Sequence, residues 1–163
     1  LVFLPLFGWY LLRSEQIAID RAKGGKVLPQ LVAKAKALFA QHRQLFIFPE
    51  GTRRPAGAPP AYKFGVAMLY QETGATVLPV VLNSGLFWPR HGFLIRPGCA
   101  VMEFLPPIAP GLGAHAFFAE LQQRLEAGTE RLLEEAAAKD PAIAAIIEKN
   151  RLTPAPATAR AEG

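Results

Sequence analysis

The feature that most constrains the fold of this chain is an apolar run that ends in a short polar turn. Leu45-Phe46-Ile47-Phe48 is followed directly by Pro49-Glu50-Gly51-Thr52-Arg53. An apolar run of this length that stops at a proline is typical of a buried strand. Residues 17–19 form another short apolar run, and the apolar spacing over residues 26–42 predicts a helix between them. The sequence therefore predicts a β-α-β unit with parallel strands.

Parallel strands end at one edge of their sheet, so the polar residues that follow the two predicted strands should lie together. Arg21 follows the first strand, Glu50, Gly51, Thr52 and Arg53 follow the second, and Lys63 precedes a helix predicted at 64–73. Two guanidinium groups, an ammonium group and a helix N-terminus suit a phosphate group. Gly51 fits a turn that needs a positive φ. Thr52 is expected to cap nearby N–H groups or to contact the ligand.

Each of these side chains also has a structural interpretation. Arg21 fits a surface ion pair with Asp20 or Glu15, and Lys63 fits a solvated position at a helix start. Glu50 and Arg53 fit an ion pair that braces the turn. The residue types alone leave both interpretations open.

The rest of the chain continues the alternation of strands and helices. We predict an α/β fold with a mixed, mainly parallel central sheet flanked by helices, forming one domain over residues 1–150 with its N-terminal part missing. Residues 151–163 are expected to be a disordered tail because they are rich in Ala, Pro and Thr. The further predicted elements are strands at 76–82, with Pro79 at an edge, bulge or end, and at 99–105, and helices at 115–138 and 141–149.

Charge is unevenly distributed along the chain. Residues 1–100 hold 12 Lys and Arg against 4 Asp and Glu, a net charge of +8, whereas residues 101–163 hold 6 against 9, a net charge of −3. The basic half suits a phosphate-bearing ligand or an anionic membrane surface. No nucleic acid partner is expected, because the chain has no run of lysine and arginine and no zinc-ligand spacing. Nor do we expect a bound metal or cofactor.

Four ordered segments resemble the lysophosphatidate acyltransferase family (1-acyl-sn-glycerol-3-phosphate acyltransferases). Phe48-Pro49-Glu50-Gly51-Thr52-Arg53 resembles the third of the family's four sequence blocks, and Lys63-Phe64-Gly65 resembles the Lys-x-Gly that follows it. Residues 8–13 with 17–21 resemble the second block, and Val77-Leu78-Pro79-Val80-Val81 resembles the fourth. Order and spacing agree over residues 4 to about 110.

The resemblance implies a reaction and a set of binding residues. The family transfers a fatty acyl group from acyl-carrier protein or acyl-CoA to the sn-2 hydroxyl of lysophosphatidate, giving phosphatidate. The positions of this sequence that match the family's binding residues would bind the glycerol-phosphate part of the acceptor. They are Arg21, Glu50, Gly51, Thr52, Arg53 and Lys63. The lipid substrate and product imply a membrane surface, at its cytoplasmic face.

The family's first block, a His-x-x-x-x-Asp pair that supplies the catalytic base, does not occur in these 163 residues. His42 and His91 are followed five residues later by Ile47 and Arg96. His115 is followed by Glu120, but on the predicted C-terminal helix, so we do not assign it a catalytic role. The chain is therefore expected to bind the acceptor but to be nearly inactive, with the missing block upstream of Leu1. Two alternatives are an acyltransferase for glycerol 3-phosphate or another phospholipid, and a non-catalytic phospholipid-binding membrane-surface module.

Overall fold

The computed structural model describes residues 28–89 and 95–152, and it divides into two compact units, Leu1–Phe46 and Ile47–Gly163. Arg21 and the strand predicted at 17–19 lie outside the described residues. Most of the predicted tail, residues 153–163, also lies outside them. The division into a domain over 1–150 and a tail therefore stays a prediction.

The described part of the first unit, residues 28–46, contains the helix α2, Leu28–Ala40, which confirms the helix predicted from apolar spacing. Pro29 lies in its first turn, where the missing N–H would have no intrahelical partner. Ala35 is completely buried. The other large apolar residues of the helix are half-buried: Leu28, Leu31, Val32, Leu38 and Phe39.

The apolar run at residues 45–48 is not a strand, which corrects the prediction of a buried strand there. Phe46 and Phe48 are 81% and 78% exposed. A strand needs a neighbour to pair its backbone N–H and C=O groups, and among the described residues none pairs with this run. The run also crosses the boundary between the two units, which falls after Phe46. The parallel pairing expected from the β-α-β pattern is accordingly not seen in the described residues.

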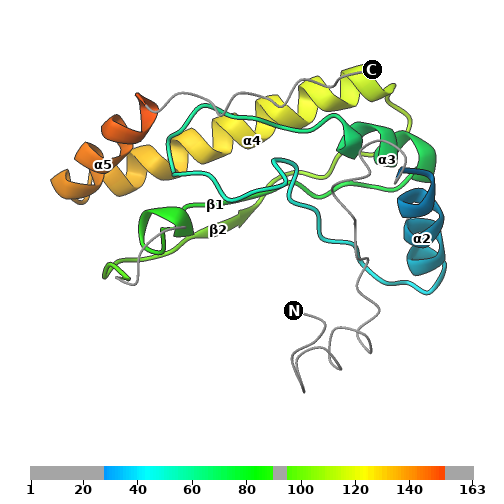
Figure 1. The fold of residues 1–163 in the computed structure, drawn as a ribbon, viewed down its shortest axis with the longest axis horizontal. Coiled ribbons are helices and arrows are strands. Elements are labelled where there is room, and N and C mark those ends of the chain that lie inside the picture. Colours follow the sequence, from blue (N-terminus) through cyan, green and yellow to red (C-terminus); the bar gives the residue numbers. More distant parts are fainter. Residues whose placement is uncertain (1–27, 90–94, 153–163) are drawn as a thin grey trace. The chain divides into compact units, whose positions relative to one another are not determined.

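The second unit is built around a long helix, α4, Ala114–Ala137. The helices α3, Gly65–Thr73, and α5, Pro141–Arg151, both pack against α4 (Figure 1). These three helices confirm the predictions at 64–73, 115–138 and 141–149. The core position near the start of α4 is Phe117, whose ring stacks on Tyr70 at 3.8 Å between centroids. The next residue, Phe118, is half-buried against Phe64.

The sheet of the second unit is an antiparallel pair, β1, Val80–Leu82, and β2, Met102–Phe104. These strands confirm the predictions at 76–82 and 99–105. Pro79 immediately precedes β1, as expected for a residue that cannot donate to the ladder. A short 3-10 helix, η2, Ser84–Leu86, follows β1.

The α4 helix packs on one face of this sheet (Figure 1). The closest approach involves Gly128 of α4. A Cβ atom at Gly128 would lie 3.2 Å from both Cγ atoms of Val81 and 3.3 Å from Cδ1 of Leu105. Glycine in a helix interior costs roughly 1 kcal/mol relative to alanine. Here that cost is offset by the close approach of the helix to β1. With helices packed on a sheet, the second unit has α/β architecture.

Candidate functional site

The turn at residues 48–51 is closed by a hydrogen bond and positioned by its proline and glycine. The Gly51 N–H donates to the carbonyl oxygen of Phe48 at 2.9 Å. Pro49 occupies the second position of the turn, where its fixed φ is favourable. Gly51 has φ +69°, and no heavy atom lies within 4 Å of the place where a Cβ would be. The need for glycine is therefore one of backbone conformation, as the sequence predicted.

A second hydrogen bond joins this turn to the start of α3. The Lys63 N–H donates to the carbonyl oxygen of Pro49 at 2.8 Å. The backbone of Lys63, two residues before the start of α3, thereby lies against the turn that leads to Thr52 and Arg53, and all three side chains are exposed. The first N–H groups of a helix and its positive dipole end favour anions. Of the predicted site residues, the turn and Lys63 are thus brought together, whereas Arg21 lies outside the described residues.

The carboxyl group of Glu50 points back into the loop that follows the turn. It accepts a hydrogen bond from the Ala61 N–H at 3.3 Å. Burial of this carboxyl group raises its pKa above the ordinary value. The Ala61 N–H and the charge of Arg54 act in the opposite direction, and the carboxylate of Glu126 adds to the increase. Glu50 therefore braces the loop, which agrees with a structural role. The hydrogen bond that does this goes to a backbone N–H and not to the side chain of Arg53.

Three residues that the sequence did not single out surround this carboxyl group. The Tyr62 hydroxyl donates a short hydrogen bond to Oε1 of Glu126 on α4. Burial, and then this bond, raise the pKa of Tyr62 well above its ordinary value, so the phenol stays a donor. Nη1 of Arg54 is buried and has no hydrogen-bond partner among the described residues. No local pattern indicated Tyr62 or Glu126, because their contact spans 64 residues.

The loop over residues 54–62 is rich in proline and glycine and forms no helix or strand, yet it is bound to two helices. Tyr62 fixes its end to α4. The Asn150 side chain of α5 donates to the carbonyl oxygen of Ala56 at 2.9 Å. With the Glu50–Ala61 bond, these contacts hold both ends of the loop. The turn and the two motif residues after it (residues 48–53, called the motif turn below) are thus supported by the C-terminal helices α4 and α5.

Among the described residues, no carboxylate pairs with His115, as a catalytic base would need. Its ring packs against Phe64 with 4.8 Å between centroids. Glu120, five residues on, binds Arg124 instead, with Oε1 at 2.6 Å from Nη2. This geometry agrees with assigning no catalytic role to His115.

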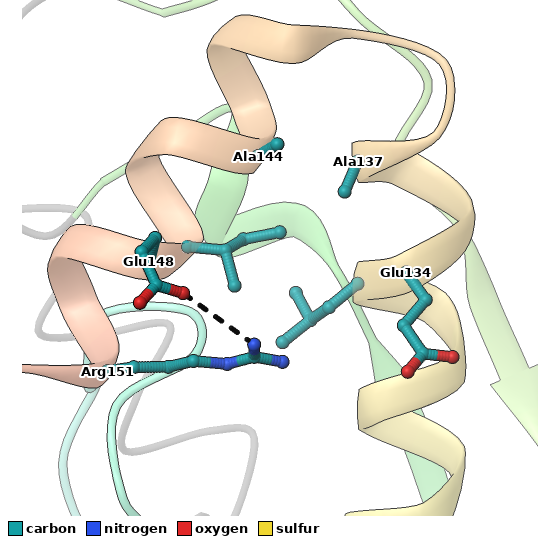
Figure 2. A pocket seen from close by; sticks show the side chains of 7 residues that line it. Glu134, Ala137, Ala144, Glu148 and Arg151 are labelled. Atoms are coloured by element: carbon teal, nitrogen blue, oxygen red, sulfur yellow. Dashed lines mark ion pairs between the residues drawn. The ribbon is translucent and has the colours of Figure 1, made fainter.

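A hollow of about 230 Å³ lies between α4 and α5 (Figure 2). Leu133, Ala137, Ala144 and Ile147 supply its apolar part. Arg151 lies across it and pairs with Glu148 at 3.8 Å, as Figure 2 shows. None of the predicted phosphate-binding residues lines this hollow, so it is separate from the motif turn.

Within residues 28–89 and 95–152, no helix combines the length and apolar character needed to cross a membrane. The same part of the chain holds no group of three or more His, Cys, Asp or Glu side chains that could bind a metal ion.

The fold and the motif turn define an α/β protein with a cationic, glycine-containing turn beside a helix start. A family model described as "Acyltransferase" matches residues 1–83, and the chain belongs to this acyltransferase family. The chain is 36% identical over 136 residues to a 1-acyl-sn-glycerol-3-phosphate acyltransferase of Pseudomonas aeruginosa, covering 83% of this chain and 52% of the relative. It is 30% identical over 113 residues to the enzyme of that name from Saccharomyces cerevisiae, covering 67% and 37%.

A solved structure shows the same fold. The 1-acyl-sn-glycerophosphate acyltransferase PlsC from Thermotoga maritima superposes with a TM-score of 0.64 at 23% identity. The match covers 80% of this chain and 52% of PlsC. The α/β acyltransferase fold predicted from the sequence is thereby confirmed. The chain spans about half the length of the bacterial relatives it matches.

Proposed function

We propose that this chain is the acceptor-binding part of a lysophosphatidate acyltransferase. The reaction is transfer of a fatty acyl group from acyl-carrier protein or acyl-CoA to the sn-2 hydroxyl of lysophosphatidate, giving phosphatidate. The observation that carries the proposal is the hydrogen bond from Lys63 to Pro49, which places the motif turn beside the start of α3. Relatives named for this activity support the choice of acceptor.

In this proposal the residues of the chain bind and orient the acceptor. Arg53, Lys63 and the positive dipole end of α3 attract the phosphate, together with Arg21 and Thr52. Each charge-assisted hydrogen bond of this kind contributes about 1.5–3 kcal/mol. Gly51 and Glu50 act by positioning: Gly51 adopts the positive φ, and Glu50 holds the loop through Ala61. A positioning role suits Glu50 because a carboxylate in direct contact with the phosphate would repel it.

The chemical step needs a base as well as a bound acceptor. The sn-2 hydroxyl oxygen attacks the thioester carbonyl carbon, the new C–O bond forms, and the C–S bond breaks. The hydroxyl proton passes to the base and then to the leaving thiolate. In the family this base belongs to the His-x-x-x-x-Asp pair, and that pattern does not occur in the 163 residues.

Titration of the chain with glycerol 3-phosphate in a calorimeter tests the phosphate site. We expect Arg53→Ala and Lys63→Ala each to weaken binding by roughly tenfold or more, the loss of one charge-assisted hydrogen bond. Lys139→Ala is the matched control, because it removes one exposed positive charge near the end of α4. Unchanged affinity in the Arg53 variant, with the helical circular dichroism intact, would show the assignment to be wrong.

A membrane surface, at the cytoplasmic face where the acyl donors are found, is the proposed site of action. The support is the lipid nature of the substrate and the net charge of +8 in residues 1–100. A second arm of the binding experiment uses vesicles that contain lysophosphatidate. Binding should weaken at high salt, since salt screens attraction between exposed charges. Equal binding to vesicles of neutral lipid at all salt concentrations would argue against this part of the proposal.

A further inference from the structure

Residues 61–63 connect the motif turn with α4, and we call them the link segment. At one end of this segment, the Ala61 N–H donates to Oε1 of Glu50 at 3.3 Å. At the other end, the Lys63 N–H donates to the carbonyl oxygen of Pro49 at 2.8 Å. The backbone of the link segment is thereby bound to the motif turn at both of its ends.

The middle residue of the link segment, Tyr62, binds α4 instead. Its hydroxyl donates to Oε1 of Glu126, and its ring packs against the core between α3 and α4. Burial, and then this hydrogen bond, raise the pKa of Tyr62 well above the ordinary value, so the hydroxyl stays protonated and a donor at neutral pH. A hydrogen bond with a carboxylate acceptor is stronger than one between neutral groups. The long helix α4 therefore holds the link segment through this bond.

The link segment leads directly into α3. Lys63 follows Tyr62, and the helix begins two residues later at Gly65. Phe64, at the N-cap position, makes no side-chain capping hydrogen bond, so the usual device for fixing a helix start is absent here. The start of α3 is held instead by the link segment and by the packing of the Phe64 ring on α4.

The charges near the link segment oppose one another. Burial raises the pKa of the Glu50 carboxyl group, the positive charge of Arg54 lowers it, and the carboxylate of Glu126 raises it further. Nη1 of Arg54 is buried and makes no hydrogen bond within the described part of the chain. A substitution at position 126 can therefore change a hydrogen bond, a charge or both, and a test must separate the two.

We propose that Tyr62 and Glu126 are positioning residues of the acceptor-binding site. Their hydrogen bond anchors the link segment on α4 and so holds Lys63 and the start of α3 against the motif turn. A site that is held in its binding geometry loses less conformational entropy when the ligand binds. The two residues act through Lys63 and not by contact with the acceptor. This inference rests on the proposed function, because it concerns the same phosphate site.

Calorimetric titration with glycerol 3-phosphate tests the role of the Tyr62 hydroxyl. Tyr62→Phe keeps the ring and should weaken binding by roughly fivefold or more. Tyr70→Phe is the matched control, because it removes a hydroxyl that donates to the carbonyl oxygen of Ala109 at 2.6 Å and accepts from the Leu112 N–H at 3.2 Å, outside the loop and the motif turn. We expect the control to keep the wild-type affinity even where its midpoint of urea unfolding falls. At a temperature at which both variants are fully folded, a loss of stability alone leaves the affinity unchanged.

A second set of variants separates the hydrogen bond from the charge at position 126 and carries the test if Tyr62→Phe fails to fold. Glu126→Gln keeps an acceptor for the phenol and should bind glycerol 3-phosphate like the wild type, whereas Glu126→Ala should lose as much affinity as Tyr62→Phe. The double variant should bind no more weakly than either single variant, because both remove the same interaction. Glu130→Ala is the control on α4, since it removes a carboxylate that binds Arg151 of α5. Circular dichroism checks that each variant retains its helices.

Three results would overturn this inference while the proposed function stands. The first is a wild-type chain that binds glycerol 3-phosphate, with unchanged affinity in Tyr62→Phe and Glu126→Ala. The second is an equal loss in the controls Tyr70→Phe and Glu130→Ala, which would make the effect one of general stability. The third is an equal loss in Glu126→Gln and Glu126→Ala, which would assign the effect to charge. A wild-type chain that does not bind glycerol 3-phosphate would overturn the proposed function and this inference with it.

Discussion

The carboxyl group of Glu50 illustrates how burial sets the behaviour of a motif residue. Its hydrogen-bond partner is a backbone N–H, and the charges of Arg54 and Glu126 act on it with opposite signs. Desolvation is the largest effect on its pKa and favours the neutral acid. Glu50 thus holds the loop through Ala61, while its contact with the ligand and its pairing with Arg53 stay predictions.

Replacing Glu50 by Gln should change how stability depends on pH. The pKa of Glu50 in the folded chain lies above the ordinary value of 4.5, so the folded state binds this proton more tightly than the unfolded state. The wild-type chain therefore loses stability as pH rises through the window above 4.5 up to the folded pKa. Glutamine stays neutral and keeps an acceptor for the Ala61 N–H. Urea unfolding should show the variant gaining stability relative to the wild type as pH rises.

Glu72→Gln serves as the control for the change in net charge, since it removes an exposed carboxylate on α3. A difference between Glu50→Gln and the wild type that stays constant across this pH range would contradict the assignment of burial as the main cause.

At the scale of elements, the contact between α4 and β1 determines the effect of Gly128→Ala. Alanine would contribute roughly 1 kcal/mol of helix propensity. Its Cβ, however, would meet both methyl groups of Val81 at 3.2 Å, and overpacking costs about 1–3 kcal/mol. Val81 is buried and its β-branched side chain has little rotamer freedom, so we expect the variant to be less stable than the wild type. Urea unfolding measures the difference.

The matching experiment repeats Gly128→Ala in a Val81→Ala background. Without the two Val81 methyl groups the helix propensity should dominate, and the same substitution should become neutral or stabilising. If Gly128→Ala stabilises the wild-type chain, the close approach of α4 to Val81 does not prevent a larger residue at position 128.

Helices were predictable from the sequence because their periodicity is local. Apolar spacing predicts α2 and α4, and Leu121, Leu125 and Leu132, which recur at helical spacing in α4, are buried. Local spacing could not decide whether residues 45–48 form a strand, because a strand needs a partner for its backbone hydrogen bonds. The long-range contacts of the site could not be predicted from local patterns either, because Asn150 and Ala56 are 94 residues apart in the sequence.

At the scale of the whole molecule, the described residues are organised to support the motif turn. The helices α4 and α5 hold the loop after the turn through Glu126 and Asn150, and the Lys63 N–H joins the turn to α3. These contacts involve residues from 48 to 150, so the turn depends on the C-terminal helices for its position.

We therefore expect this chain to bind the acceptor without catalysing acyl transfer to it. None of its three histidines is followed by Asp at the fifth position, and Glu120, which follows His115, is bound to Arg124. We expect the 163-residue chain to bind glycerol 3-phosphate. We also expect it to transfer acyl groups to lysophosphatidate at a near-background rate, because it has no base to deprotonate the sn-2 hydroxyl. General-base catalysis contributes about 10²–10⁴-fold to the rate of such reactions. The assay measures release of coenzyme A from acyl-CoA, or of the carrier protein from its acyl form, with the Pseudomonas aeruginosa relative as the positive control. Transfer at a rate comparable to that relative would mean that a base other than the family pair acts in this chain.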